Sequence, residues 1–142
     1  MTLAAAQVID ALAARLTPVV LSGGRVFTSR SWPITVDELP AWRVVAEGET
    51  AERQYVGQTI NEHALSVSAV GYVRAVANLD DAMHALAAAG MTALFAVPAP
   101  YDLQLDSISR SMSTEGDAAV GVITVNLTAR FAADQATPET IF

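Results

Sequence analysis

The chain has 142 residues, the length of a single domain, and its formal net charge is −7 at pH 7. Its 15 acidic residues against eight basic ones argue against a nucleic-acid-binding protein, which needs a basic surface to neutralise phosphates. The absence of cysteine excludes disulfides, thiol catalysis and thiolate metal sites. No apolar run approaches the ~20 residues of a membrane span, and no basic segment precedes the apolar N-terminus, so neither a membrane span nor a signal peptide is expected.

An amphipathic helix is predicted at residues 2–16 and ends before Pro18, which cannot continue a helix. Its apolar residues recur at helical spacing along one side: Ala5, Val8, Ile9, Leu12 and Leu16. Residues 19–28 then place short apolar segments on both sides of a Ser-Gly-Gly turn. This pattern is typical of a small hairpin, or of a loop that leads into one short strand.

Residues 29–40 contain two prolines and predict an extended connection. A strand is predicted at residues 42–47, because alternate residues from Trp42 to Ala46 are apolar and share one face. Residues 47–58 are acidic and contain glycine, and they predict a flexible polar arm or a long hairpin tip before the next strand. A connection of this length in a compact domain is usually functional or disordered.

The most regular stretch is a predicted strand followed by a predicted helix. Residues 63–75 alternate apolar and polar side chains, which indicates a half-buried strand with Gly71 as a gap in its apolar face. Asn78 is a candidate N-cap, and Asp80 and Asp81 place negative charge in the first turn, where the helix dipole favours it. The apolar residues of the helix are Leu79, Met83, Leu86, Ala87, Gly90, Leu94 and Val97. We interpret the pair as a strand and the helix that covers its inner face.

The helical pattern becomes irregular at Gly90. Up to residue 89 the polar side of the helix carries aspartate and histidine, but beyond Gly90 the same side carries Met91 and Phe95. Either the helix ends or kinks at Gly90, or something else, such as a neighbouring subunit, covers its last turns.

Two further strands are predicted in the last third of the chain. Residues 107–114 carry serine at every odd position and indicate a strand whose serine face lies toward solvent or an interface. Residues 115–117, Glu-Gly-Asp, are typical of a hairpin turn, and residues 121–131 form the clearest strand pattern in the chain. Residues 132–142 have few packing residues before their end and are predicted as a C-terminal tail or a swapped arm.

The order of these elements predicts the fold class. Strands joined by hairpin-like connections favour a mostly antiparallel sheet. The helices need the apolar face of that sheet, so the expected fold is an α+β two-layer sandwich with two main helices packed on one face. We see no internal repeat or second domain and assign residues 1–142 to one domain.

The sequence offers no convincing catalytic or metal-binding site. His63 and His84 are interpreted as exposed or edge residues, and their spacing does not supply a set of metal ligands. The Ser-Gly-Gly-Arg turn that ends at Arg25 lacks the lysine and the following helix of a phosphate-binding loop. The serines at residues 107–113 occur without a nucleophile elbow. We therefore predict no catalytic residue, no metal, no cofactor and no enzymatic activity.

The order of several segments resembles the tail terminator family, the minor tail protein U type of lambda-like long-tailed phages and prophages. The matching segments are G-R-V-F-T-S-R at 24–30, D-E-L-P-A-W-R-V-V at 37–45, G-E-T-A-E-R at 48–53, L-D-D-A-M-H-A-L at 79–86 and E-G-D-A-A-V-G-V-I-T-V-N-L at 115–127. The resemblance covers most of the chain and rests on the order and spacing of these segments. Residues 31–40 and the far C-terminus depart from the family pattern.

This resemblance implies a structural subunit that forms a homo-hexameric ring at the head-proximal end of the tail, in the neck region of the virion, after assembly in the host cytoplasm. The ring stops polymerisation of the major tail protein and gives the head-completion or connector protein its attachment surface. DNA passes through the ring without sequence-specific binding. Two alternatives stay open: another ring component of the neck or tail tube, and a small ligand-binding α+β dimer.

In a ring, the acidic arm, the apolar residues beyond Gly90 and the C-terminal tail become candidate contacts between subunits or with partners. The candidate interface residues are Arg25, Arg30, Glu47, Glu49, Glu52, Arg53, Tyr55, Met91 and Phe95. Copies that each carry a charge of −7 also repel one another, so ring closure is expected to depend on ionic strength.

Overall fold

The computed structural model describes residues 3–19, 23, 25–28, 40–53, 56–75, 78–96, 101–115, 118–138 and 141. This part of the chain forms two helices and five strands: α1 (Ala4–Leu16), β1 (Val26–Phe27), β2 (Ala41–Arg53), β3 (Ile60–Ala75), α2 (Leu79–Leu94), β4 (Asp102–Glu115) and β5 (Ala118–Asp134). The strands form one sheet in the order β1-β2-β3-β5-β4. Neighbouring strands are antiparallel except β1 and β2, which are parallel.

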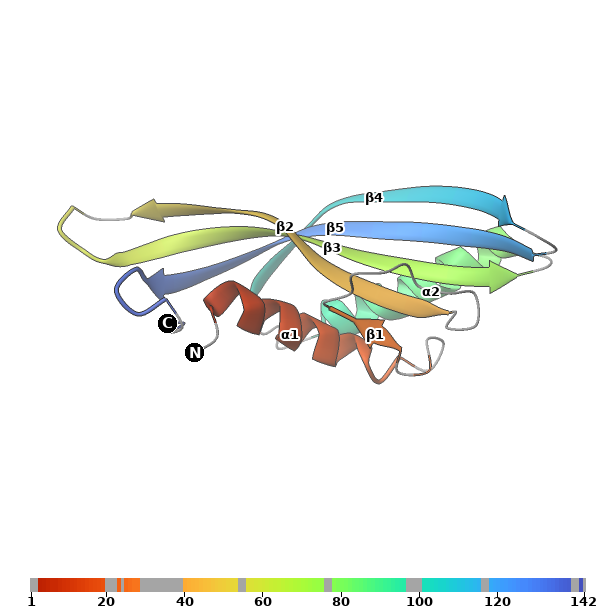
Figure 1. Ribbon diagram of the computed structural model, residues 1–142, viewed down its shortest axis with the longest axis horizontal. Coiled ribbons are helices and arrows are strands. Elements are labelled where there is room, and N and C mark those ends of the chain that lie inside the picture. Colours follow the sequence, from red (N-terminus) through yellow and green to blue (C-terminus); the bar gives the residue numbers. More distant parts are fainter. Residues whose placement is uncertain are drawn as a thin grey trace.

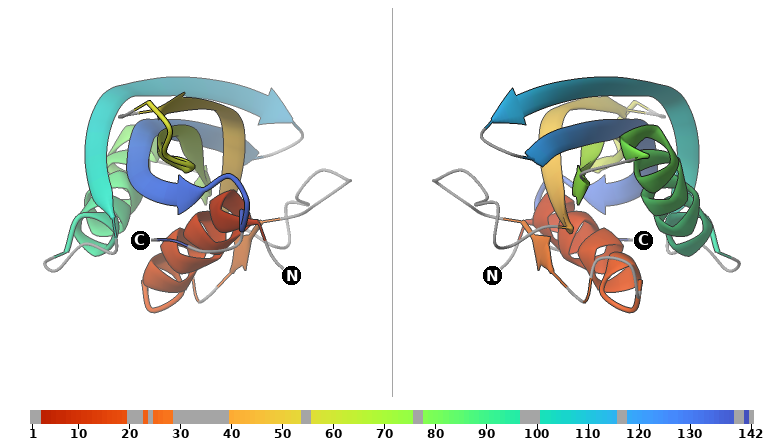
Figure 2. Two further views of the ribbon diagram at one scale, coloured as in Figure 1. Left: turned by 90° about the vertical axis from the view of Figure 1, so that its left-hand side faces the viewer. Right: turned by 90° about the vertical axis from the view of Figure 1, so that its right-hand side faces the viewer.

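Both helices lie on the same side of the sheet, which curves over them (Figures 1 and 2). The predicted α+β fold, with a mostly antiparallel sheet and two helices on one face, is confirmed. The strands are longer than the helices: the 17 residues of β5 span about 55 Å, whereas the 16 residues of α2 span about 24 Å. One end of the sheet therefore reaches past the helices, at the left of Figure 1.

The core lies between the helices and the inner face of the sheet. On β3 and β5 this face is at most 1% exposed at Leu65, Val67, Ala69, Ile123, Val125 and Leu127. From α1, Val8, Leu12 and Leu16 are fully buried against it, so the predicted apolar stripe of the first helix is confirmed. Alternation along the strands places every second side chain in the core, as the sequence pattern predicts.

Trp42 is fully buried and fills the space between β3 and α2. A Cβ atom on Gly90 would lie 2.3 Å from Cζ2 of the indole, and one on Gly71 would lie 3.2 Å from Cη2. Both glycines therefore make room for the Trp42 ring. α2 continues through Gly90 to Leu94, so the helix does not end at Gly90 as one of the two alternatives expected.

The last turns of α2 are covered by the chain itself. Met91 and Phe95 are partly buried and pack against the core cluster, so the fold does not require a neighbouring subunit to shield them. The predicted N-cap at Asn78 is wrong: its side chain makes no capping hydrogen bond, and its backbone is left-handed with φ 57°. Asp80 and Asp81 do lie in the first turn, as predicted.

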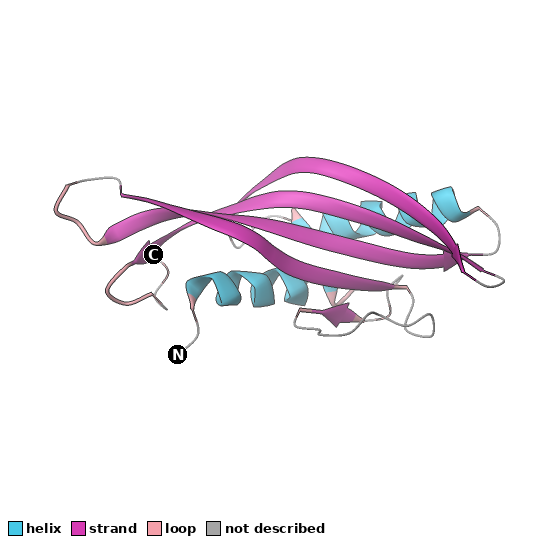
Figure 3. Ribbon diagram, turned by 45° about the horizontal axis from the view of Figure 1, so that its top comes forward, coloured by secondary structure: helices cyan, strands magenta, loops and turns pink. Residues whose placement is uncertain are grey.

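Several strands are longer than the sequence pattern indicated. β2 continues to Arg53 after a bulge between Ala46 and Gly48, so residues 47–53 are not a flexible arm but one strand of a hairpin (Figure 3). The bulge allows Glu49 to pair with Leu65 on the inner face, which resets the alternation and lets a charged segment extend the strand. β4 begins at residue 102 and β5 ends at residue 134, inside the predicted tail.

Within residues 19–28 the described residues contain the short strand β1, which pairs with β2. Residues 20–22 and 24, on which the choice between the two predicted arrangements depends, lie outside the described residues. Residues 29–39, where an extended connection is predicted, lie outside the described residues. β4 and β5 are antiparallel and pair from Glu115 and Ala118 onward. Residues 116 and 117 of the turn predicted at 115–117 lie outside the described residues.

Candidate interaction surface

The end of the sheet that projects past the helices is a hairpin, called here the arm and defined as residues 46–53 and 56–63 (Figure 1). All residues of β2 from Ala46 to Arg53 are exposed. At the tip, the Val56 side chain is 99% exposed, and Gly57 has φ 85°, a left-handed conformation that favours glycine. The arm carries four of the predicted interface residues, Glu47, Glu49, Glu52 and Arg53, whereas Tyr55 lies outside the described residues.

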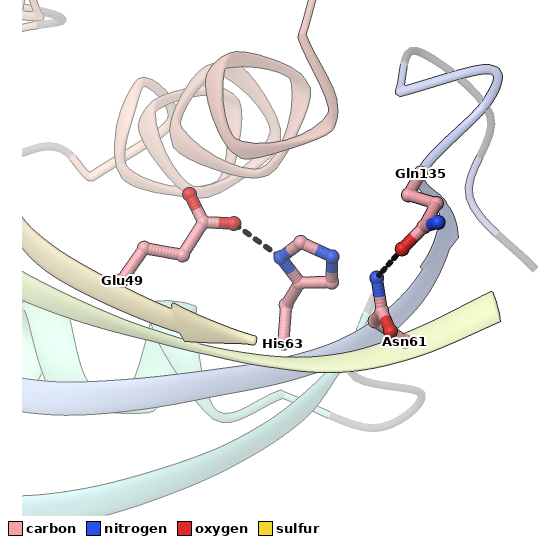
Figure 4. A network of polar contacts seen from close by, with 4 residues as sticks. All are labelled: Glu49, Asn61, His63 and Gln135. Carbon is pink, nitrogen blue, oxygen red and sulfur yellow. Dashed lines mark hydrogen bonds and ion pairs between the residues drawn. The ribbon is translucent and has the colours of Figure 1, made fainter. Parts of the chain in front are cut away.

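His63 joins the two strands of the arm to the rest of the sheet (Figure 4). Its Nδ1 lies 2.6 Å from Oε2 of Glu49 on β2. Its imidazole stacks on Phe131 of β5, with ring centroids 5.1 Å apart and an interplanar angle of 11°. The His63 side chain is only 19% exposed, so the prediction of an exposed or edge histidine is wrong for His63; it holds for His84, which is exposed.

The base of the arm is bound to the segment that follows β5. Asn61 Nδ2 donates a hydrogen bond to Gln135 Oε1 at 3.3 Å (Figure 4), and the backbone N–H of Gln135 donates to the Thr59 carbonyl at 2.9 Å. The Pro138 carbonyl in turn accepts a hydrogen bond from the N–H of Ala4, at the start of α1. The first half of the predicted C-terminal tail is therefore a turn docked between the arm and α1.

Asp134 stabilises this turn. Its carboxylate accepts a hydrogen bond from the backbone N–H of Ala136 at 2.9 Å, and this bond, with further ones from Thr59 and Thr137, lowers the pKa of Asp134. A carboxyl group whose pKa is lower in the folded state stabilises that state above its unfolded pKa, and the contribution disappears as the pH falls through the folded pKa.

Replacing Asp134 with asparagine is therefore expected to lower the free energy of unfolding by a small amount near neutral pH, and by progressively less below pH 4. Asparagine keeps an oxygen acceptor for the Ala136 N–H, so the difference reports the charge. Urea unfolding of both proteins at pH 7 and at pH 3 measures it. An equal difference at both pH values would contradict the role of the ionised carboxylate.

A groove opens between the C-terminal end of α1 and the second half of α2. Its volume is about 560 Å³, and it is lined by Arg15, Pro18, Val19, Ala88, Ala89, Thr92 and Ala93. On the α2 side the walls are the small side chains of Ala88, Ala89, Thr92 and Ala93, and Pro18 and Val19 line the other side. Arg15 closes one side, where its Nη1 donates a hydrogen bond to the Ala96 carbonyl at 2.9 Å.

The other predicted interface residues lie apart from the arm. Arg25 donates a hydrogen bond from Nε to the Pro40 carbonyl at 2.9 Å, and its own carbonyl accepts the N–H of Trp42, so Arg25 fixes the start of β2. Arg30 lies outside the described residues. Met91 and Phe95 pack against the core from α2. Among the described residues, the predicted set thus divides into the arm residues, the pair Met91 and Phe95 at the end of α2, and Arg25.

Polar side chains form a hydrogen-bonded row across the outer face of the sheet. Ser68 Oγ donates to Asn126 Oδ1 at 2.9 Å, and Asn126 Nδ2 donates to Ser107 Oγ at 3.0 Å, so one chain of hydrogen bonds crosses three strands. Thr128 Oγ1 donates to Asp106 Oδ2 at 2.6 Å beside it. The serine side of β4 belongs to this outer face, and residues 107, 109 and 111 are exposed, as the sequence predicts.

Comparison of the chain with protein-family models and with curated proteins found no match. Within the described residues, no group of three His, Cys, Asp or Glu side chains is placed to hold a metal ion. No helix in that part of the chain is long and apolar enough to cross a membrane. Among the described residues, the arm and the α1–α2 groove both expose apolar surface, at Val56 and along the helices respectively.

Proposed function

We propose that the protein is a phage tail terminator, a non-enzymatic structural subunit that forms a hexameric ring on the head-proximal end of the tail. The ring ends polymerisation of the major tail protein and carries the attachment surface for a head-completion protein, with DNA passing through its centre. No cofactor or metal takes part. The order and spacing of the segments that resemble this family support the proposal over most of the chain.

The arm is the observation that carries the proposal. A two-stranded hairpin that projects from a monomer buries little apolar surface and is only marginally stable by itself. Here the hairpin is nevertheless braced at its base by the contact between His63 and Glu49 and by the docked turn after Asp134. Bracing of an exposed, projecting hairpin suits a subunit that uses it against other subunits.

An assembly assay tests this function directly. The purified protein is added to polymerising major tail protein from the same phage, and tube lengths are measured by electron microscopy against a reaction without it. A terminator caps the tubes and stops their growth at one end. Self-polymerisation of the purified protein into tubes would favour the alternative of a tail-tube component, and unchanged tube lengths would contradict the proposal.

A small ligand-binding dimer is the alternative that the α1–α2 groove favours, because its volume of about 560 Å³ lies within the range of small-molecule sites. The two proposed functions predict oligomers of different mass. A hexamer of 14.9 kDa subunits has a mass of about 89 kDa, whereas a dimer has a mass of about 30 kDa. Sedimentation of the purified protein therefore separates them.

Raising the salt concentration is expected to shift the population toward the hexamer. Six copies with a net charge of −7 together carry about −42, and the Debye length falls from about 10 Å at 0.1 M salt to about 3 Å at 1 M. Sedimentation velocity across this range measures the shift, and a magnesium series at matched ionic strength shows whether divalent cations act beyond screening. A distribution indifferent to salt would contradict charge repulsion as the force that opposes closure.

A further inference from the structure

We propose that the tip of each arm seats in the α1–α2 groove of a neighbouring copy, so that head-to-tail contacts hold the ring together. This inference rests on the proposed ring and names the two surfaces that close it. The occupant of the groove is a second copy of this chain, which inserts Val56 and the turn at Gly57.

The described part of the arm tip, residues 56 and 57, is exposed. Val56 is 99% exposed, more than any other large apolar residue among those described as exposed. A Cβ atom built on Gly57 would have no atom within 4 Å, so Gly57 also stands clear of the described part of the protein. An aliphatic side chain at the end of a braced hairpin is a compact apolar projection, available to a partner surface.

The groove matches this projection in chemistry and size. Pro18, Val19 and the alanines of α2 form its apolar walls, and their short side chains leave the floor open. The groove is shallow and open, and its volume of about 560 Å³ exceeds what one valine side chain fills. Insertion would remove apolar surface of both partners from water.

The arm of a molecule points away from that molecule's own groove. The first residues of α1, Ala4 and Ala5, line a small cavity together with Glu49 and His63 at the arm. The groove begins at the other end of α1, about 20 Å away along a helix of 13 residues, whereas the arm extends in the opposite direction (Figure 1). The contact therefore joins different copies through unlike surfaces, an arrangement that closes into a ring when the rotation between copies permits.

Charge favours the same pairing. The arm exposes Glu52 and Arg53 next to its tip, and because side chains alternate along β2 they lie on opposite faces of the strand. Arg15 is the charged residue in the described lining of the groove. A tip that seats with its Glu52 face toward Arg15 brings opposite charges together, although the chain as a whole is acidic.

Cysteine cross-linking tests the contact, because the natural chain contains no cysteine. The double variant Val56→Cys/Thr92→Cys places one thiol on the tip and one on the exposed side of the groove. Mild oxidation should then produce a ladder of disulfide-linked species up to the hexamer on non-reducing gels. The matched control, Val56→Cys/Ser66→Cys, moves the second thiol to an exposed position on β3 outside the groove and should link at least 10-fold less.

A second pair of variants tests the apolar contact between Val56 and the groove without oxidation. Val56→Glu is expected to weaken association at least 10-fold in sedimentation while leaving the circular dichroism spectrum and the Tm unchanged, because Val56 is almost entirely in solvent. Gln58→Glu adds the same charge two residues away and should weaken association much less. If both variants weaken association equally, charge at the tip and not burial of Val56 decides assembly. That result would contradict the proposed contact between Val56 and the groove.

The outcomes separate this inference from the proposed function. If the protein is a hexamer but Val56→Cys/Thr92→Cys links no better than the control, the proposed contact between the arm tip and the groove is wrong. The proposal of a hexameric ring would still hold. A ladder that stops at a dimer would support the contact and contradict the ring. A protein that is monomeric at every salt and protein concentration tested, and that leaves the tube lengths unchanged, would contradict both.

Discussion

Gly90→Ala is expected to lower the free energy of unfolding by about 1–3 kcal/mol, the usual cost of overpacking a core. In an exposed helix the same change would stabilise by roughly 1 kcal/mol, because alanine is the better helix former. Here the new Cβ would lie 2.3 Å from Cζ2 and 2.7 Å from Cη2 of Trp42. The indole is a rigid ring that is fully buried, so α2 must move away from the sheet to relieve the clash.

Two other glycines provide graded controls. A Cβ on Gly121 would lie 2.4 Å from Sδ of Met83, but a thioether side chain can rotate aside, so Gly121→Ala should cost less than Gly90→Ala. A Cβ on Gly48 would have no atom within 4 Å, so Gly48→Ala should change stability little. Urea unfolding of the three variants gives the ranking. Losses of equal size at Gly90 and Gly48 would show that the Trp42 contact does not limit α2.

Trp42→Ala is expected to cost about 3–5 kcal/mol, because it removes a fully buried aromatic side chain and leaves a cavity between β3 and α2. Trp42→Phe should cost much less. Among the described residues the buried indole Nε1 has no hydrogen-bond partner. Phenylalanine removes this unsatisfied donor, whose burial costs about 1–3 kcal/mol, while it keeps an aromatic ring. Thermal and urea unfolding followed by circular dichroism measure both changes.

A double-mutant cycle connects the two predictions. In the Trp42→Ala background the ring that opposes a Cβ at Gly90 is gone, so Gly90→Ala should become neutral or stabilising. The coupling measured in this way belongs to the helix–sheet contact alone. If Gly90→Ala cost the same in both backgrounds, the loss would have to come from another feature of α2.

The core was predictable from the sequence because burial repeats with the period of each element. The same core contains residues 65, 67 and 69 of β3 and residues 83 and 86 of α2. The strand period of two residues and the helix period of 3.6 residues can both be recognised in the sequence alone. The α+β class follows from the order of these elements alone. The serine side of β4 was predictable on the same grounds.

The surfaces that matter for assembly were less predictable. The bulge after Ala46 shifts the alternation by one residue, so the charged half of β2 resembles a loop in the sequence. Gly90 resembles a helix end because the indole that requires it lies 48 positions earlier in the chain. The α1–α2 groove arises only when two helices distant in sequence pack together. In the sequence, the tip of the arm is marked by Val56, an aliphatic residue within a polar segment.

The position of β5 has a consequence for how the protein is made. β5 is the last strand in the chain, but it lies between β3 and β4 in the sheet. A chain synthesised only as far as Glu115 would hold β3 and β4 without the strand that joins them, and would present unpaired edges to other chains. The pairing of β3 with β5 also joins strands that are distant in sequence, and such pairings are slow to establish. The sheet can therefore be completed only after residue 134 has been synthesised. We expect translation products that end before β5 to aggregate and not to enter an assembly.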